Sequence, residues 1–181
     1  VQTGVGLTGT AWAYQQLGLE PDVVAFGKKV QLGGIMAGRR VDEVADNVFT
    51  VSGRINSTWG GGLADMVRSR RLLEIIEREE LAARAASLGA WFLTELAEVG
   101  ARHPGLVSNV RGRGLMCAFD LPGAAERDSL ISLVREEELV LLLPAGPRSI
   151  RFRPALTIGE DELTVGLKAL DRSLSRLASQ Q

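Results

Sequence analysis

The chain has 181 residues, 45% of them hydrophobic, and a formal net charge of -1. This length is enough for one hydrophobic core, or for about one and a half structural units that share a helix. The near balance of acidic and basic residues excludes the electrostatic footprint of a protein that binds nucleic acid or an anionic membrane.

The first 30 residues predict a loop, a helix and a strand, in that order. A glycine-rich loop at 3–9 precedes a short helix, which begins near Thr10 and ends at Gly18. Residues 22–27 include an uninterrupted apolar run, typical of a strand that is covered on both faces in a parallel sheet. That strand delivers Lys28 to the sheet edge, where an amine short of water can lose its proton and attack a carbonyl group. A solvated lysine after a strand is the alternative interpretation.

The middle of the chain predicts a second strand, a loop and a long helical segment. The second strand is expected at 33–38, and a helix around 41–45. Residues 55–62 contain too many Gly, Ser and Thr residues for a helix or a strand, so we expect a functional loop. From Leu63 to about Ala101, apolar residues recur near helical spacing, which predicts one long helix or two consecutive ones.

The remainder of the chain predicts a small α/β unit. The glycines within 107–121 indicate a turn followed by a strand, and a helix is expected at 124–137. Two more strands are predicted at 139–143 and 150–153. A final helix at 160–177 has acidic residues at its start and basic residues toward its end, as the helix dipole favours.

The single cysteine, Cys117, and the single histidine, His103, limit the chemistry. They exclude an internal disulfide and a zinc site built from Cys and His, so no metal site is expected. Cys117 is interpreted as a small core residue, and His103 as a favourable charge at a helix C-terminus. Core positions are also expected for Trp12, Trp91 and Phe92.

The location and extent of the protein follow from what the sequence lacks. No apolar run approaches the roughly 20 residues of a membrane span, and no charged and apolar leader precedes the first elements. The single cysteine, which excludes an internal disulfide, predicts a reducing, cytoplasmic setting. Because Val1 stands in what reads as the middle of a structural element, we interpret the chain as the C-terminal part of a longer protein.

Three segments allow an anion-binding interpretation. Residues 4–9 match the G-x-G-x-x-G pattern of dinucleotide-binding proteins, although the required preceding strand is not visible. Residues 57–62 run directly into the long helical segment, and free amides at a helix N-terminus suit a phosphate; an ordinary helix start is the alternative. Arg151 and Arg153 share one face of a strand and could clamp a carboxylate, but a solvated or salt-bridged face is the commoner use of such arginines.

Several motifs occur together in one order: Gln2-Thr-Gly, Gly6-x-Thr-Gly9, Pro21-Asp with Lys28 six positions after the aspartate, Ser57-Thr-Trp-Gly-Gly61, Gly112-Arg-Gly114 and Arg151-Phe-x-Pro. As a set they resemble the class III aminotransferases, which are fold-type I enzymes that depend on pyridoxal 5'-phosphate. The resemblance implies an α/β fold in three parts. These are the C-terminal part of the large cofactor domain at 1–63, a connecting helical segment at 64–104 and a small C-terminal α/β domain at 105–181.

The resemblance also implies roles for the two residues nearest the cofactor ring. Lys28, rather than Lys29, forms the Schiff base with pyridoxal 5'-phosphate and, once free, moves a proton as general acid and base. The side chains of these neighbouring lysines should diverge. Gln2 is expected near the phenolic oxygen of the ring.

The remaining roles concern the phosphate and the substrate. The resemblance implies that Thr58 binds the cofactor phosphate of the neighbouring subunit, which requires a homodimer. It also implies that Asn56 lies near the substrate and that Arg151 binds the α-carboxylate of 2-oxoglutarate or glutamate.

Within this family, residues 25–44 most resemble the L-lysine 6-aminotransferases. That implies transfer of the ε-amino group of L-lysine to 2-oxoglutarate, giving glutamate and 2-aminoadipate 6-semialdehyde. Another ω-aminotransferase, of the ornithine or 4-aminobutyrate type, and a non-catalytic truncated remnant are the alternatives. The family's Asp-Glu pair before Val1 is missing, so the chain alone is expected to be an incomplete enzyme. Two local departures are Gly62, where asparagine is usual, and Pro154-Ala155 in place of Pro-Pro.

Overall fold

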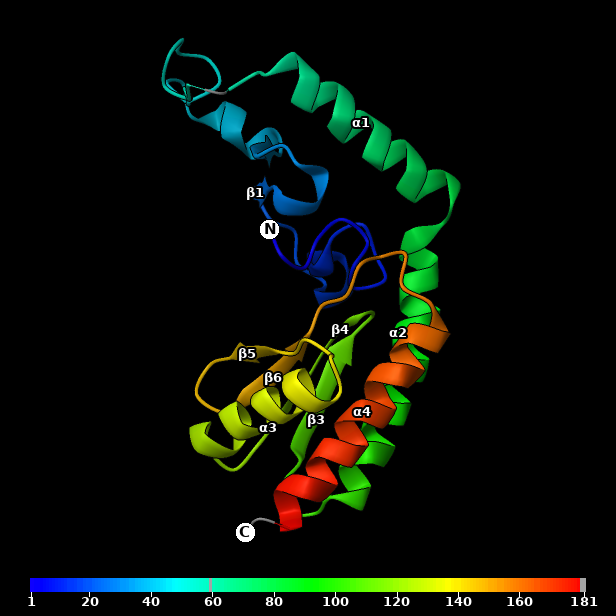
Figure 1. The fold of residues 1–181 in the computed structure, drawn as a ribbon. Coiled ribbons are helices and arrows are strands. Elements are labelled where there is room, and N and C mark those ends of the chain that lie inside the picture. Colours follow the sequence, from blue (N-terminus) through cyan, green and yellow to red (C-terminus); the bar gives the residue numbers. More distant parts are fainter. Residues whose placement is uncertain (59, 180–181) are drawn as a thin grey trace.

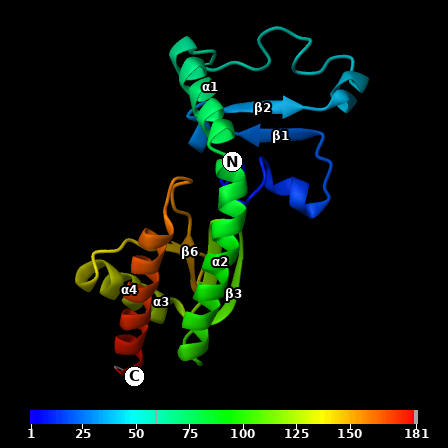
Figure 2. The ribbon, with the colours of Figure 1, turned by 90° about the vertical axis from the view of Figure 1, so that its right-hand side faces the viewer.

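The computed structural model describes residues 1–58 and 60–179. A two-stranded sheet and a four-stranded sheet lie toward opposite ends of the molecule, and helices α1 (Leu63–Arg78) and α2 (Leu81–Arg102) run between them (Figures 1 and 2). No described helix is both long enough and apolar enough to cross a lipid bilayer.

The two-stranded sheet is an antiparallel hairpin of β1 (Val23–Phe26) and β2 (Gly34–Ala37). Along β1, exposed and half-buried residues alternate, and Val23 is 52% exposed. The predicted strand is therefore present, but the expectation of a parallel-sheet strand that is covered on both faces is wrong for the described residues. An apolar run cannot by itself distinguish a doubly covered strand from a hairpin strand.

Short 3-10 helices replace the first two predicted helices. The helix expected from Thr10 is η1 (Ala13–Leu17), which ends at Gly18 as predicted, and the helix expected around 41–45 is η3 (Arg39–Glu43). Between them, η2 (Lys28–Val30) follows β1 directly. In segments this short, few hydrogen bonds form to offset the free energy that nucleation of an α-helix requires. A tight 3-10 turn is the usual form of such short helical pieces.

The long helical segment is two helices. Glu80, between α1 and α2, has a left-handed backbone with a φ of 48°, which interrupts the helical hydrogen bonding. Neither a glycine nor a proline marks this break, so the sequence left both alternatives open. α1 begins at Leu63, where the loop was expected to end.

The second sheet is antiparallel throughout, with strand order β3-β4-β6-β5. Its strands are β3 (Ser108–Arg113), β4 (Met116–Asp120), β5 (Leu143–Ala145) and β6 (Ser149–Phe152). The strand predicted at 139–143 is wrong, because β5 begins at Leu143. Leu139 and Leu141 are 87% and 77% exposed, so this apolar run does not mark a sheet position.

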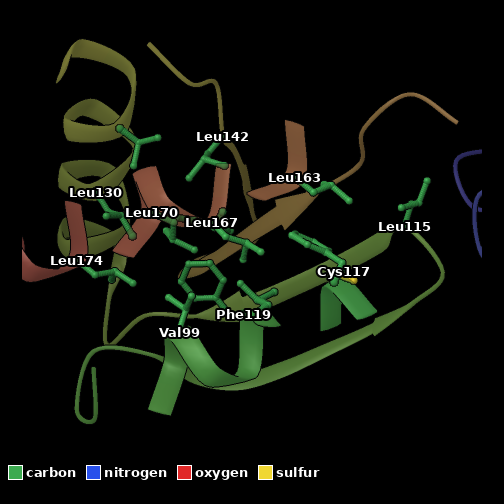
Figure 3. Close-up of a cluster of buried hydrophobic side chains, with 14 of the residues drawn as sticks. Val99, Leu115, Cys117, Phe119, Leu130, Leu142, Leu163, Leu167, Leu170 and Leu174 are labelled. Carbon is green, nitrogen blue, oxygen red and sulfur yellow. The ribbon is translucent and has the colours of Figure 1, made fainter. Parts of the chain in front are cut away.

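Helices α2, α3 (Ala124–Glu137) and α4 (Glu160–Ser179) pack with this sheet around the main core. Figure 3 shows leucines of α3 and α4 gathered with Phe119 of β4. Phe92 is 1% exposed, whereas Trp12 and Trp91 are only partly buried. Cys117 is fully buried, as predicted, and burial raises the pKa of its thiol to about 12, which makes it unreactive.

The glycine-rich segment 4–9 lies against α2 and the β3–β4 turn. Leu7 is fully buried, and the Leu115 N–H donates a hydrogen bond to the Leu7 carbonyl at 3.0 Å. A Cβ added to Gly114 would lie 2.5 Å from the carbonyl carbon of Thr8, and one added to Gly89 would lie 2.1 Å from the carbonyl carbon of Gly114. Three stretches of backbone therefore stack in direct contact, which only residues without a side chain allow.

We expect Gly89→Ala to destabilise the fold by about 3 kcal/mol or more, because the new methyl group overlaps the backbone of the hairpin turn. Gly166→Ala is the matched control in α4, where an added Cβ has no atom within 4 Å. The control should be neutral or stabilising by up to about 1 kcal/mol, since alanine is the better helix former. Chemical denaturation gives both values, and equal midpoints for the two variants would contradict the stacking argument.

Candidate functional site

Gln2 is the meeting point of three distant segments. Arg151 Nη1, on β6, donates a hydrogen bond to Gln2 Oε1 at 2.8 Å. Lys29 Nζ, on η2, donates a second one to the Gln2 main-chain oxygen, also at 2.8 Å. The fold thus joins the start of the chain, the turn that carries the two lysines and the arginine strand in one place.

Lys28 occupies the first position of η2. Its backbone is left-handed, with a φ of 55°, and the Gln31 N–H closes the turn on the Lys28 carbonyl at 2.8 Å. Within the described ranges, no hydrogen bond or ion pair involves Lys28 Nζ, and the residue is exposed. Lys29 is instead half-buried and bonded to Gln2. One of the two neighbouring amines is therefore held by the fold and the other is available.

Positive charge gathers beside Gln2. Burial, together with the like charge of Arg153, lowers the pKa of Lys29. Among the residues that the structure places, no acidic side chain forms an ion pair with Lys29, Arg151 or Arg153. The Nε atoms of both arginines are buried without a hydrogen-bond partner. A cluster of cations that are not paired with carboxylates suits an anionic ligand such as a carboxylate or a phosphate.

A hollow of about 370 Å³ lies next to this cluster. Its polar lining comes from Lys29, Arg153 and Thr157, and apolar residues of α1 and of the segment after β6 make up most of the rest. Arg84 of α2 fixes that segment, because its guanidinium donates hydrogen bonds to the carbonyls of Leu156, at 3.0 Å, and of Ile158. Sequence reasoning gave no role to Lys29 or Arg84, since no local pattern shows such long-range contacts.

The start of β6 is held by a buried carboxylate. Asp120 accepts hydrogen bonds from Ser149 Oγ at 2.5 Å and from Asn109 Nδ2 at 2.8 Å, and its Oδ1 lies 2.9 Å from Arg111 Nη1. Burial on its own would raise the pKa of Asp120, but these three partners outweigh it and hold the pKa at about 2. The network fixes Ser149 two residues before Arg151.

Asn56 and Thr58 are not brought to Gln2 in this chain. Both are exposed in the loop before α1, and neither bonds to Gln2, Lys28 or Arg151 among the described residues. Figure 1 shows this loop in cyan, at the far end of the molecule from β6. Trp59 lies outside the described residues.

The dinucleotide-binding interpretation of 4–9 is wrong. Three of its amides already have acceptors, since the N–H groups of Val5 and Gly6 donate to the Ala11 carbonyl and the Gly9 N–H donates to the Gly6 carbonyl. The segment is also followed by a 3-10 helix rather than by the α-helix that the fingerprint needs. These three amides are therefore not available to a pyrophosphate.

Comparison with known proteins identifies the family. The pattern described as Aminotransferase class-III matches residues 1–174. The chain is 57% identical over 178 residues to the L-lysine-epsilon aminotransferase of Streptomyces clavuligerus, covering 98% of the chain and 39% of that relative. It is 40% identical over 158 residues to the mitochondrial 4-aminobutyrate aminotransferase of Sus scrofa, covering 86% of the chain and 30% of the relative. The chain therefore belongs to the class III aminotransferase family.

Solved structures agree with this assignment. The lysine aminotransferase from M. tuberculosis in the internal aldimine form superposes with a TM-score of 0.93 at 56% identity, covering 98% of this chain and 40% of that one. An S-selective transaminase from Arthrobacter sp. shares the fold alone, with a TM-score of 0.86 at 22% identity, and covers 99% and 43%. The predicted family and α/β fold are confirmed, and the chain spans about two fifths of the length of the L-lysine-epsilon aminotransferase that it matches.

We expect Asp120→Asn to lower the free energy of unfolding at neutral pH by about 1–3 kcal/mol, because it removes the charge that three donors satisfy. The pKa of Asp120 lies at about 2 in the folded protein, below the roughly 3.9 of an unfolded aspartate, so this contribution is fully present above pH ~4. It disappears as the pH falls toward ~2. Urea denaturation of both proteins between neutral pH and the acid limit measures the difference, and a difference independent of pH would contradict the proposed network.

Proposed function

We propose that the chain supplies the cofactor lysine and the carboxylate-binding arginine of a pyridoxal-phosphate-dependent aminotransferase that acts on L-lysine and 2-oxoglutarate. The observation that carries the proposal is the 57% identity to an L-lysine-epsilon aminotransferase over 98% of the chain. The 4-aminobutyrate aminotransferase is less similar, at 40% over 86% of the chain.

The residues present fit this cofactor. Lys28 offers an exposed amine without a partner in the described part of the chain, and Lys29, Arg151 and Arg153 supply positive charge for anionic groups. Pyridoxal 5'-phosphate, when bound, supplies an electron sink for the negative charge that develops on the substrate carbon. Lys28 Nζ holds the cofactor and, once displaced, accepts the proton from that carbon.

Arg151 and Gln2 form the substrate side of the proposed site. The Arg151 guanidinium binds the α-carboxylate of 2-oxoglutarate or glutamate through paired hydrogen bonds. Gln2 lies beside the cofactor ring, close to its phenolic oxygen. The hydrogen bond between the two side chains supports this arrangement, since it places them 2.8 Å apart although they are 149 positions apart in sequence.

In the proposed homodimer, Asn56 and Thr58 complete the site. Thr58 reaches the cofactor phosphate of the neighbouring subunit, and Asn56 lies near the substrate. Their exposure, and the absence of a hydrogen bond from either to Lys28 among the described residues, support a contribution in trans. Two variants of the M. tuberculosis relative have solved structures, one with an asparagine substituted and one with a threonine substituted. The threonine lies two positions after the asparagine in that relative, which is also the spacing of Asn56 and Thr58.

The proposed reaction transfers the ε-amino group of L-lysine to 2-oxoglutarate and gives glutamate and 2-aminoadipate 6-semialdehyde. Another ω-aminotransferase is the second candidate, favoured by the similarity to 4-aminobutyrate aminotransferases. Since the chain spans about 39% of its curated relatives, every test uses protein expressed from the whole reading frame that contains these residues.

Lys28 should carry the cofactor. After incubation with pyridoxal 5'-phosphate and reduction with borohydride, peptide mass mapping should locate the adduct on Lys28 and not on Lys29 or Lys168, the only other lysines of the chain. Lys28→Arg keeps the charge but lacks a reactive amine, so the adduct should be lost, whereas the exposed control Lys168→Arg should retain it. An adduct at another lysine, or none at all, would overturn the assignment.

L-lysine should be the preferred amino donor. With 2-oxoglutarate as acceptor, kcat/KM for L-lysine should exceed the values for ornithine and 4-aminobutyrate. A higher value for either competitor would replace the lysine assignment with the second candidate. Absence of turnover with all three donors would instead favour a non-catalytic protein.

A further inference from the structure

We propose that Lys29 is a positioning residue of this site, which fixes Gln2 and, through Gln2, orients Arg151 relative to Lys28. The inference rests on the proposed function and adds a residue to it. Lys29 does not touch the substrate in this proposal. Its amine acts on the site through the backbone of Gln2.

The geometry around Gln2 carries the proposal. The main-chain oxygen of Gln2 accepts a hydrogen bond from Lys29, and the side-chain oxygen accepts one from Arg151, both at 2.8 Å. In the described structure, Lys29 is the only donor to that main-chain oxygen. Among the described residues, Gln2 lies outside the helices and strands. These two bonds connect Gln2 to η2 on one side and to β6 on the other.

The surroundings of Lys29 indicate a specific donor rather than a residue that only covers apolar surface. Burial and the nearby Arg153 both disfavour the charge on its amine, and the hollow along its side chain is largely apolar. A methionine would fill this hollow at lower cost. What methionine cannot supply is the hydrogen bond to Gln2.

The turn of η2 couples Lys29 to Lys28. The left-handed backbone of Lys28, closed by the hydrogen bond from Gln31, sets the directions of the two neighbouring side chains. A bond that ties Lys29 to Gln2 therefore also sets where Gln2 lies relative to Lys28. One residue thus links the proposed cofactor amine to the proposed carboxylate anchor.

The experiment compares Lys29→Met with the exposed control Lys168→Met. Lys29→Met keeps the unbranched stem in the hollow and removes the donor. We expect it to retain the borohydride adduct on Lys28, and to raise both the Kd for glutarate, an unreactive dicarboxylate, and the KM for 2-oxoglutarate. The expected rise is about 3- to 10-fold, the effect of one hydrogen bond, and it should fall on KM more than on kcat. The control should match the wild type.

Two further variants separate positioning from a general structural effect. Lys29→Arg keeps a donor and should restore most of the affinity for glutarate. Gln2→Ala keeps the carbonyl that Lys29 binds but removes the link to Arg151, so Lys29→Met should have no further effect on glutarate binding in that background. Equal effects of Lys29→Met in the two backgrounds would overturn the proposal.

The outcomes distinguish the two levels of inference. If wild-type protein carries no adduct on Lys28, the proposed function itself fails. If the adduct is on Lys28 but Lys29→Met binds glutarate as the wild type does, only the role of Lys29 is overturned.

Discussion

The close stacking of three backbones at Gly114 is the constraint on which the rest of the structure depends. α2 contributes Gly89 on one side, and the segment 4–9 lies on the other, with Leu7 inserted into the core. Since no side chain separates these backbones, the segment that leads from Gln2 cannot shift against the sheet that carries Arg151 without breaking the contact. The hydrogen bond between Gln2 and Arg151 is thus the outcome of packing that is set several residues away.

Two sets of polar contacts hold β6 in place, in addition to the backbone stacking at Gly114. The Asp120 network holds the beginning of β6, and Arg84 holds the backbone that follows it. Arg151 lies between these two anchors, so both flanks of its strand are fixed by charge-assisted hydrogen bonds. The buried Nε atoms of Arg151 and Arg153 have no hydrogen-bond partner in the described part of the chain, which suits the proposed anionic ligand.

Elements with strong local signals could be predicted from sequence. α3 matches its predicted range, α1 begins at Leu63 as expected, and Cys117 lies in the core. The failures occurred where the outcome depended on partners: β1 lacks the covering layers that its apolar run suggested, and the run at 139–143 lies mostly outside the sheet. The contact between Gln2 and Arg151 had no local signal, because it joins segments at opposite ends of the chain. Only the family resemblance pointed to both residues, and the roles of Lys28, Gln2, Asn56, Thr58 and Arg151 all stay predictions.

The inert thiol of Cys117 offers an experimental advantage. Because it is the only cysteine of these 181 residues and is fully buried, it should not compete for a maleimide dye under native conditions. A cysteine introduced beside Thr58 would then be the one reactive position in this stretch. Fluorescence from such a label could report whether the exposed loop meets another protein surface in solution.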